Sequence, residues 1–234
     1  VLGARILTGD GRVLRFGGEV MKNVAGYDVA RLMAGSLGVL GVLLDVSLKL
    51  LPRPADERTL ALELDQARAL EHMASLARGA LPLSASSWID GRLYLRFDGS
   101  LETLDAVAAR VGGELLPDGG SFWASLREQT HPFFAGEQPL WRCTVPGLVA
   151  PLPLGDVSLV EWNGMQRWYR GVADTAAFEA AAAVGGHATL FRHHTEAAEV
   201  FAPLVPPLLR LHRELKRVFD PAGILNPGRM YADL

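Results

Sequence analysis

A proline-rich segment at residues 51–55 divides the sequence into two stretches of different character, and this division limits how the chain folds. In the short stretch before it, apolar runs at residues 2–7 and 12–16 flank Asp10-Gly11, a pattern that predicts a β-hairpin. In the long stretch after it, short strand-like segments alternate with amphipathic segments of helical length. This alternation is typical of an antiparallel sheet with helices on one face. We therefore expect an α+β fold whose second part is a ferredoxin-like or larger antiparallel α+β domain.

Charge and cysteine content exclude several functional classes. The chain has 234 residues, with 23 basic against 26 acidic side chains and a net charge of −3. No basic stripe suited to nucleic-acid phosphates is expected from this balance, so a nucleic-acid partner is excluded. The single Cys143 cannot form an internal disulfide, a multi-thiolate zinc site or an iron–sulfur cluster. We expect it to be a buried thiol in the strand-like run at residues 140–145.

No segment predicts membrane insertion or export. The longest apolar-rich stretch, residues 37–51, is interrupted by Asp45 and Lys49 and is shorter than the ~20 residues that a membrane helix needs. The N-terminus lacks the pattern of a signal peptide. We expect a cytoplasmic protein without a direct membrane anchor, associated with a membrane only through partners. Because the sequence opens with Val1 inside a strand-like run, we also expect a fragment whose beginning is missing.

Two motifs stand out as candidates for ligand binding. Gly35, Gly38 and Gly41 recur at a spacing of three between a predicted helix and a predicted strand, where glycine permits positive φ and close approach of a ligand. The spacing and direction fit neither a Rossmann loop nor a P-loop, so a ligand-contacting loop and a tight structural connection both stay open. The second motif, residues 219–230, has two successive Pro/Gly turns. A C-terminal tail this rigid either closes over a ligand or only fastens the C-terminus to the rest of the fold.

The histidines give little sign of a metal site. His193 and His194 are adjacent, so on a strand their side chains point to opposite faces, and no other compact ligand pattern is present. We expect no metal. His187, which follows a glycine pair, and Arg192 are weak catalytic candidates that rest on position alone.

Together these motifs resemble a known family. The run from Gly18 to Val42, the segments 16–19 and 185–189, and the tail from Phe219 to Tyr231 resemble FAD-linked oxidases of the vanillyl-alcohol-oxidase type. Within that family they are similar to the FAD-binding, E-type subunits of glycolate oxidases. The resemblance extends over essentially the whole chain.

The resemblance implies a domain organisation for the chain. Residues 1–52 would be the second half of a PCMH-type FAD-binding domain, residues 53–215 an α+β cap domain, and residues 216–234 a segment that returns to the flavin. The implied cofactor is FAD. The residues implied to contact it are Lys22, Asn23, Gly26, Tyr27, Gly35, Ser36, Gly38, Gly41, Val42 and Asn226.

The implied activity is oxidation of a small 2-hydroxy acid to the 2-oxo acid through flavin. The implied partners are a related catalytic flavin subunit and an iron–sulfur subunit of the glycolate oxidase complex. The family's first FAD subdomain should precede Val1, so we expect this chain alone to hold FAD weakly or not at all and to be inactive by itself.

Two alternatives stay open. The cap lacks the His-Gly-His-x-Gly-Asp-Gly-Asn motif that catalytic relatives use for metal and substrate, which favours a non-catalytic scaffold subunit that retains the flavin-oxidase fold. A self-sufficient D-2-hydroxy-acid dehydrogenase of the same fold is the other, and it would need those missing residues.

Overall fold

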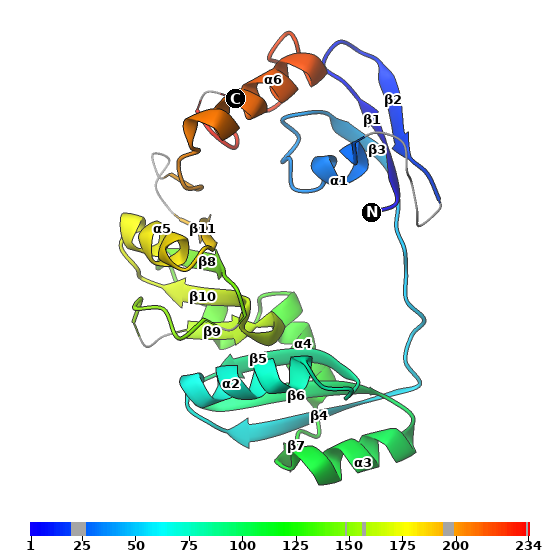
Figure 1. Ribbon diagram of the computed structural model, residues 1–234, viewed down its shortest axis with the longest axis vertical. Coiled ribbons are helices and arrows are strands. Elements are labelled where there is room, and N and C mark those ends of the chain that lie inside the picture. Colours follow the sequence, from blue (N-terminus) through cyan, green and yellow to red (C-terminus); the bar gives the residue numbers. More distant parts are fainter. Residues whose placement is uncertain (20–26, 148, 156–157, 194–198, 233) are drawn as a thin grey trace. The chain divides into compact units, whose positions relative to one another are not determined.

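The computed structural model describes residues 1–19, 27–147, 149–155, 158–193, 199–232 and 234. Within it the chain forms two compact units, each described here by itself (Figure 1). The first unit combines Val1–Pro52 with Pro203–Leu234, and the second is Arg53–Ala202. The first unit is therefore built from both ends of the chain.

A three-stranded antiparallel sheet forms the centre of the first unit, in the order β2-β1-β3. Its elements are β1 (Gly3–Leu7), β2 (Val13–Gly17), α1 (Val29–Met33), β3 (Val42–Ser47) and α6 (Pro206–Phe219). The predicted hairpin is confirmed, with Gly11 at φ +82° in its turn. Asp28 caps α1 by accepting a hydrogen bond from the N–H of Arg31, which fixes where this short helix begins. Residues 34–41, which form the glycine loop with Gly35, Gly38 and Gly41, follow α1 directly and lead into β3.

The helix α6 corrects the expected domain boundary. The sequence predicts a cap that extends to residue 215, but α6 belongs to the first unit from its start at Pro206. Leu215 and Phe219 pack into the core of that unit, and the Phe219 ring lies 6.2 Å from that of Phe16. The buried side of α6 is therefore formed by Leu215, Lys216 and Phe219, whereas the apolar side chains of Leu208, Leu211 and Val218 are exposed.

The second unit contains an eight-stranded antiparallel sheet in the order β11-β8-β10-β9-β5-β6-β4-β7. Its strands are β4 (Asp56–Glu63), β5 (Leu83–Ile89), β6 (Arg92–Gly99), β7 (Glu114–Leu115), β8 (Leu140–Thr144), β9 (Ser158–Glu161), β10 (Gln166–Arg170) and β11 (His187–Arg192). Its helices are α2 (Gln66–Ala77), α3 (Leu101–Val111), α4 (Gly119–Arg127) and α5 (Asp174–Ala183), with single turns at Pro132–Phe134 and Trp162–Gly164.

This sheet consists of two ferredoxin-like halves joined edge to edge. In the first half, β4 to β7 lie in the order β5-β6-β4-β7, and β8 to β11 repeat that order as β9-β10-β8-β11. The two halves meet where β5 pairs with β9 through Ser87 to Ile89. The expected α+β class with a ferredoxin-like arrangement is confirmed.

The two faces of the sheet are covered differently. On one face, α2 and α3 pack on the first half around Leu93, Leu95 and Phe97, and α5 packs on the second half around Trp141 and Tyr169. On the other face, α4 and the turn at Pro132–Phe134 cover only part of the strands. Side chains in the uncovered part of this second face are therefore free to line a cavity.

Cys143 lies in β8 and is completely buried, as the sequence predicts. Burial raises the pKa of its thiol to about 12. Because only the thiolate is nucleophilic, we expect the folded protein not to react with a thiol reagent such as DTNB at pH 8, and to react completely once urea unfolds it. Rapid labelling of the folded protein would contradict the burial of this thiol.

In the described part of the chain, no helix combines the length and apolar character required to cross a bilayer.

Candidate functional site

The glycine loop makes a tight turn between α1 and β3. Gly35, Leu37 and Gly38 have φ values of +83°, +51° and +77°, while Val39 and Leu40 are buried and anchor the loop in the core. The backbone N–H groups of Gly35 and Gly38 donate no hydrogen bond to any described residue. Unpaired backbone N–H groups beside left-handed residues form the kind of concave surface that binds anions.

The C-terminal tail closes on this loop through Asn226. Its side-chain Nδ2 donates a hydrogen bond of 2.7 Å to the carbonyl oxygen of Leu37. A Cβ atom on Gly38 would lie 2.6 Å from that same Nδ2 atom, so only glycine allows the contact. The two motifs that the sequence singled out, 189 residues apart, therefore form one local structure.

A buried ion pair holds the tail in this position. The ammonium group of Lys216, on α6, donates hydrogen bonds to Asp220 Oδ2 (2.7 Å), to the Val39 carbonyl (2.9 Å) and to the Leu225 carbonyl (2.6 Å). It thereby ties the glycine loop, the end of α6 and the tail to one another.

Asp220 completes this cluster. Only 2% exposed, it accepts hydrogen bonds from the backbone N–H groups of Leu225 (2.8 Å) and Ile224 (3.2 Å). Sequence reasoning missed both Lys216 and Asp220. The sequence signal that could have indicated this pair is a Lys four residues before an Asp at the end of a helix. That spacing more often marks an exposed ion pair.

Asp220 makes the stability of the first unit depend on pH. Burial by itself raises the pKa of this carboxyl group, but the hydrogen bonds from Lys216, Leu225 and Ile224 outweigh burial and hold the pKa below its ordinary value of 3.8. The stabilisation is therefore complete above the unfolded-state pKa and is lost as the pH falls below it. We expect hydrogen exchange in the tail to speed up between pH 5 and pH 3, after correction for intrinsic rates. An Asp220→Asn variant should lack this additional pH dependence, and equal pH dependence in both proteins would contradict the assignment.

The remaining predicted contact residues divide into three groups. Lys22, Asn23 and Gly26 lie outside the described residues. Tyr27 is 97% exposed, and Val42 begins β3 with half of its side chain exposed. Ser36 and Gly41 are buried within the glycine loop. Their contact with a cofactor stays a prediction.

The two weak catalytic candidates belong to the second unit. His187 is an exposed residue at the start of β11. Arg192, at the end of the same strand, donates a hydrogen bond to the carbonyl of Phe134 and so anchors the turn at Pro132–Phe134. Neither lines the large cavity of this unit. Among the residues that the structure describes, no cluster of three or more His, Cys, Asp or Glu suits a metal ion.

The first unit fits a dinucleotide cofactor such as FAD. Gly35 offers open space where a side chain would stand, and its unpaired N–H, with that of Gly38, supplies donors for a pyrophosphate. The exposed Asn226 adds a polar amide beside them. Such donors are already in position before a ligand arrives, which lowers the cost of ordering them.

Comparison with known proteins agrees with this geometry. Residues 159–230, which include α6 and most of the tail, match the family described as "FAD linked oxidases, C-terminal domain". The whole chain is 44% identical over 235 residues to glycolate oxidase subunit GlcE of Escherichia coli (strain K12). The chain belongs to the FAD-linked oxidase family.

Other members of this family are more distant. The chain is 23% identical to glycolate oxidase subunit GlcD of Bacillus subtilis (strain 168) and 24% identical to a D-lactate dehydrogenase of Archaeoglobus fulgidus, over 99% and 100% of its length. It spans 66% of the Escherichia coli relative, 63% of the Bacillus relative and 65% of the Archaeoglobus relative. About a third of each relative therefore has no counterpart in this sequence.

Proposed function

We propose that the chain is part of the FAD-binding subunit of a complex that oxidises glycolate or a related 2-hydroxy acid to the 2-oxo acid. The observation that carries this proposal is the closure of the tail on the glycine loop, with Asn226 bonded to Leu37 over Gly38. The names of the relatives support the substrate class, since two are glycolate oxidase subunits and a third is a D-lactate dehydrogenase.

The chain's own residues have a binding role in this proposal. The N–H groups of Gly35 and Gly38 would bind the FAD pyrophosphate, and the Asn226 amide would lie near the ring system. Lys216 and Asp220 would act as positioning residues, because they hold the loop and the tail together. When bound, FAD supplies the acceptor for the hydride that leaves the substrate carbon.

The same comparison supports an assembly of several subunits. The Escherichia coli relative is named as a subunit, which indicates an assembly of several chains. We propose a related catalytic flavin subunit and an iron–sulfur subunit as the partners. Residues 1–52 and the tail would then form part of the FAD-binding domain, and the second unit would be the cap.

One observation favours a second candidate, a scaffold subunit that retains the flavin-oxidase fold without turnover. His187 is exposed, and Arg192 is used to anchor a neighbouring turn. The two residues named as weak catalytic candidates therefore have no catalytic geometry in this unit.

Replacing Gly38 by Ala tests the flavin proposal. The new methyl group would collide with the Asn226 amide and displace it from the Leu37 carbonyl, and it would strain the backbone at a φ of +77°. We expect the FAD affinity of the chain, measured by quenching of flavin fluorescence, to fall about tenfold, which corresponds to ~1.4 kcal/mol.

Gly11→Ala is the matched control. Gly11 has a similar φ of +82°, but nothing lies within 4 Å of the position of its Cβ, so backbone strain is introduced without a collision. We expect this variant to bind FAD like the unmodified chain. Equal affinity of the Gly38→Ala protein would contradict the proposed site.

A further inference from the structure

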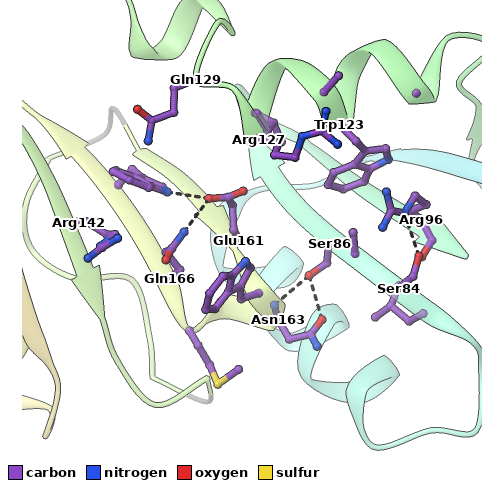
Figure 2. Close-up of a pocket in the computed structure, with 18 of the residues that line it drawn as sticks. Ser84, Ser86, Arg96, Trp123, Arg127, Gln129, Arg142, Glu161, Asn163 and Gln166 are labelled. Atoms are coloured by element: carbon purple, nitrogen blue, oxygen red, sulfur yellow. Dashed lines mark hydrogen bonds between the residues drawn. The ribbon is translucent and has the colours of Figure 1, made fainter. Parts of the chain in front are cut away.

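The second unit holds a cavity of about 870 Å³ on the partly covered face of its sheet. Strands of both ferredoxin-like halves line it, and α4 forms one wall (Figure 2). This volume lies in the range of sites for small organic ligands, about 300–1,000 Å³. All residues that line the cavity belong to the second unit.

Three arginines line this cavity, and two of them are already paired. Arg96 lies 3.9 Å from Glu57 and 3.8 Å from Asp98, and Arg127 lies 2.6 Å from Glu128. The side chain of Arg142, on β8, has neither a hydrogen bond nor an ion pair with any residue that the structure describes. The cavity therefore offers one unmatched positive charge.

Aromatic rings hold the Arg142 side chain in place. Its guanidinium carbon lies 5.3 Å from the centre of the Phe191 ring and 6.0 Å from that of Trp168, so the group is flanked by apolar surface while its N–H donors stay unused. A guanidinium group with five donors and reduced hydration is well suited to bind a carboxylate. Such a carboxylate would accept hydrogen bonds from the unused N–H donors of Arg142.

Glu161 adds a fixed hydrogen-bond acceptor in the middle of the cavity (Figure 2). Its Oε2 atom accepts hydrogen bonds from the indole Nε1 of Trp168 (2.7 Å) and from Nε2 of Gln166 (3.0 Å). Its Oε1 atom makes no hydrogen bond to the described residues and is free to accept one from a ligand hydroxyl. The same carboxylate repels a second anionic group, so the cavity favours ligands with a single negative charge.

A strained turn places an exposed indole at this cavity. Trp162 and Asn163 both have positive φ, +52° and +55°, which is unusual for residues other than glycine. Ser86 holds the turn, since its Oγ accepts a hydrogen bond from the Asn163 N–H and donates one to Asn163 Oδ1, both 2.9 Å. Trp162 is 64% exposed and lines the cavity. Backbone strain of this kind is concentrated at binding sites.

We propose that this cavity binds an organic monocarboxylate that carries a hydroxyl group and a planar apolar body. The carboxylate pairs with Arg142, the hydroxyl donates to Glu161, and the planar body packs against Trp162 and Trp123. This chemistry describes an aryl-substituted 2-hydroxy acid, whereas a two-carbon acid leaves most of the cavity empty. Binding needs no flavin; only the assignment of the ligand as a substrate rests on the proposed function.

The test is a titration of the whole 234-residue chain with phenyllactate in the absence of flavin, followed by calorimetry and by tryptophan fluorescence. Three further compounds each remove one feature: phenylpropanoate lacks the hydroxyl, 2-phenylethanol lacks the carboxylate, and glycolate lacks the planar body. We expect saturable binding of phenyllactate, weaker binding of phenylpropanoate and glycolate, and no binding of phenylethanol.

Variants assign the binding to the cavity. Arg142→Gln should weaken phenyllactate binding about tenfold or more, because a charge-assisted pair is lost. Arg110→Gln, on the exposed surface of α3, is the matched control and should bind normally. If Arg142→Gln fails to fold, Trp162→Ala, which changes an exposed side chain, should weaken phenyllactate binding and leave glycolate binding unchanged.

Three outcomes would overturn the proposal. They are no phenyllactate binding at about 10 mM, unchanged affinity in the cavity variants, and glycolate binding as tightly as phenyllactate. Because flavin is absent, a failure here is distinct from a failure of the Gly38→Ala test.

Discussion

Replacing Asp220 by Ala is expected to lower the free energy of unfolding of the first unit by about 3–5 kcal/mol. The substitution leaves the Lys216 ammonium group, whose side chain is only 11% exposed, without its counter-ion. It also removes the acceptor for the N–H groups of Ile224 and Leu225. Removing one partner of a buried ion pair destabilises a protein far more than replacing both partners by apolar residues does. The reason is that the remaining charge stays desolvated.

The positions of the tryptophans make it possible to tell which unit the Asp220→Ala substitution destabilises. All 5 tryptophans, at positions 88, 123, 141, 162 and 168, belong to the second unit, so tryptophan fluorescence reports only that unit. We expect hydrogen exchange of residues 1–19 and 206–232 in the Asp220→Ala protein to show unfolding at lower urea, while the fluorescence transition stays in place.

Glu214→Ala is the control on the same helix. Glu214 pairs with Arg217 at 2.7 Å, but both side chains are more than half exposed. Exposed pairs contribute only about 0–1 kcal/mol, so this variant should behave like the unmodified chain. An Asp220→Ala protein as stable as the Glu214→Ala protein would show that Lys216 and Asp220 do not hold the tail.

Arg167→Ala is expected to destabilise the second unit by about 3–5 kcal/mol. Arg167 is completely buried in β10, and its guanidinium group donates to the carbonyls of Gly164 (3.0 Å), Ala150 and Val149. Without it, three carbonyl groups lose their donor and a large side-chain volume becomes empty. Burial also lowers the pKa of Arg167 from its ordinary value, because the uncharged oxygens and neutral side chains around it do not fully compensate for desolvation.

Here tryptophan fluorescence is the direct measurement. The urea midpoint of the fluorescence transition should fall strongly in Arg167→Ala and less in Arg167→Lys, which keeps the charge but loses the forked geometry. Arg110→Ala, on the exposed side of α3, should leave the midpoint unchanged. A small effect of Arg167→Ala would mean that water replaces the guanidinium donors.

The sequence predicts the local elements of this fold well. The Asp10-Gly11 hairpin depends only on neighbouring residues, and the structure confirms it. The alternation of strands and helices also predicts the α+β class. These features follow from turn chemistry and periodicity, which are short-range properties.

The contacts between distant segments were not predictable in the same way. The sequence of α6 does not say which part of the chain it packs against, and the structure places Leu215 and Phe219 in the core of the first unit. The edge-to-edge joining of the two ferredoxin-like halves depends on the pairing of β5 with β9. Backbone pairing of this kind leaves no periodic signal in either strand.

The candidate site was predicted only in part for the same reason. The glycines and Asn226 stand out because their residue types are unusual at those spacings. Lys216 and Asp220 are ordinary charged residues of a helix end, and only the tertiary structure makes them a buried pair. Arg142 and Glu161 come together only through the antiparallel register of β8, β10 and β9, which places Arg142 opposite Trp168 and Glu161 opposite Gln166.

The most direct test of the flavin account is an absorption and fluorescence titration of FAD with the unmodified chain at increasing protein concentration. The account predicts weak, saturable quenching of flavin fluorescence with a shift of the visible bands, and a weaker effect of riboflavin, which has no pyrophosphate for the N–H groups of Gly35 and Gly38. Equal affinity for riboflavin, or tight binding of FAD by this chain alone, would contradict it.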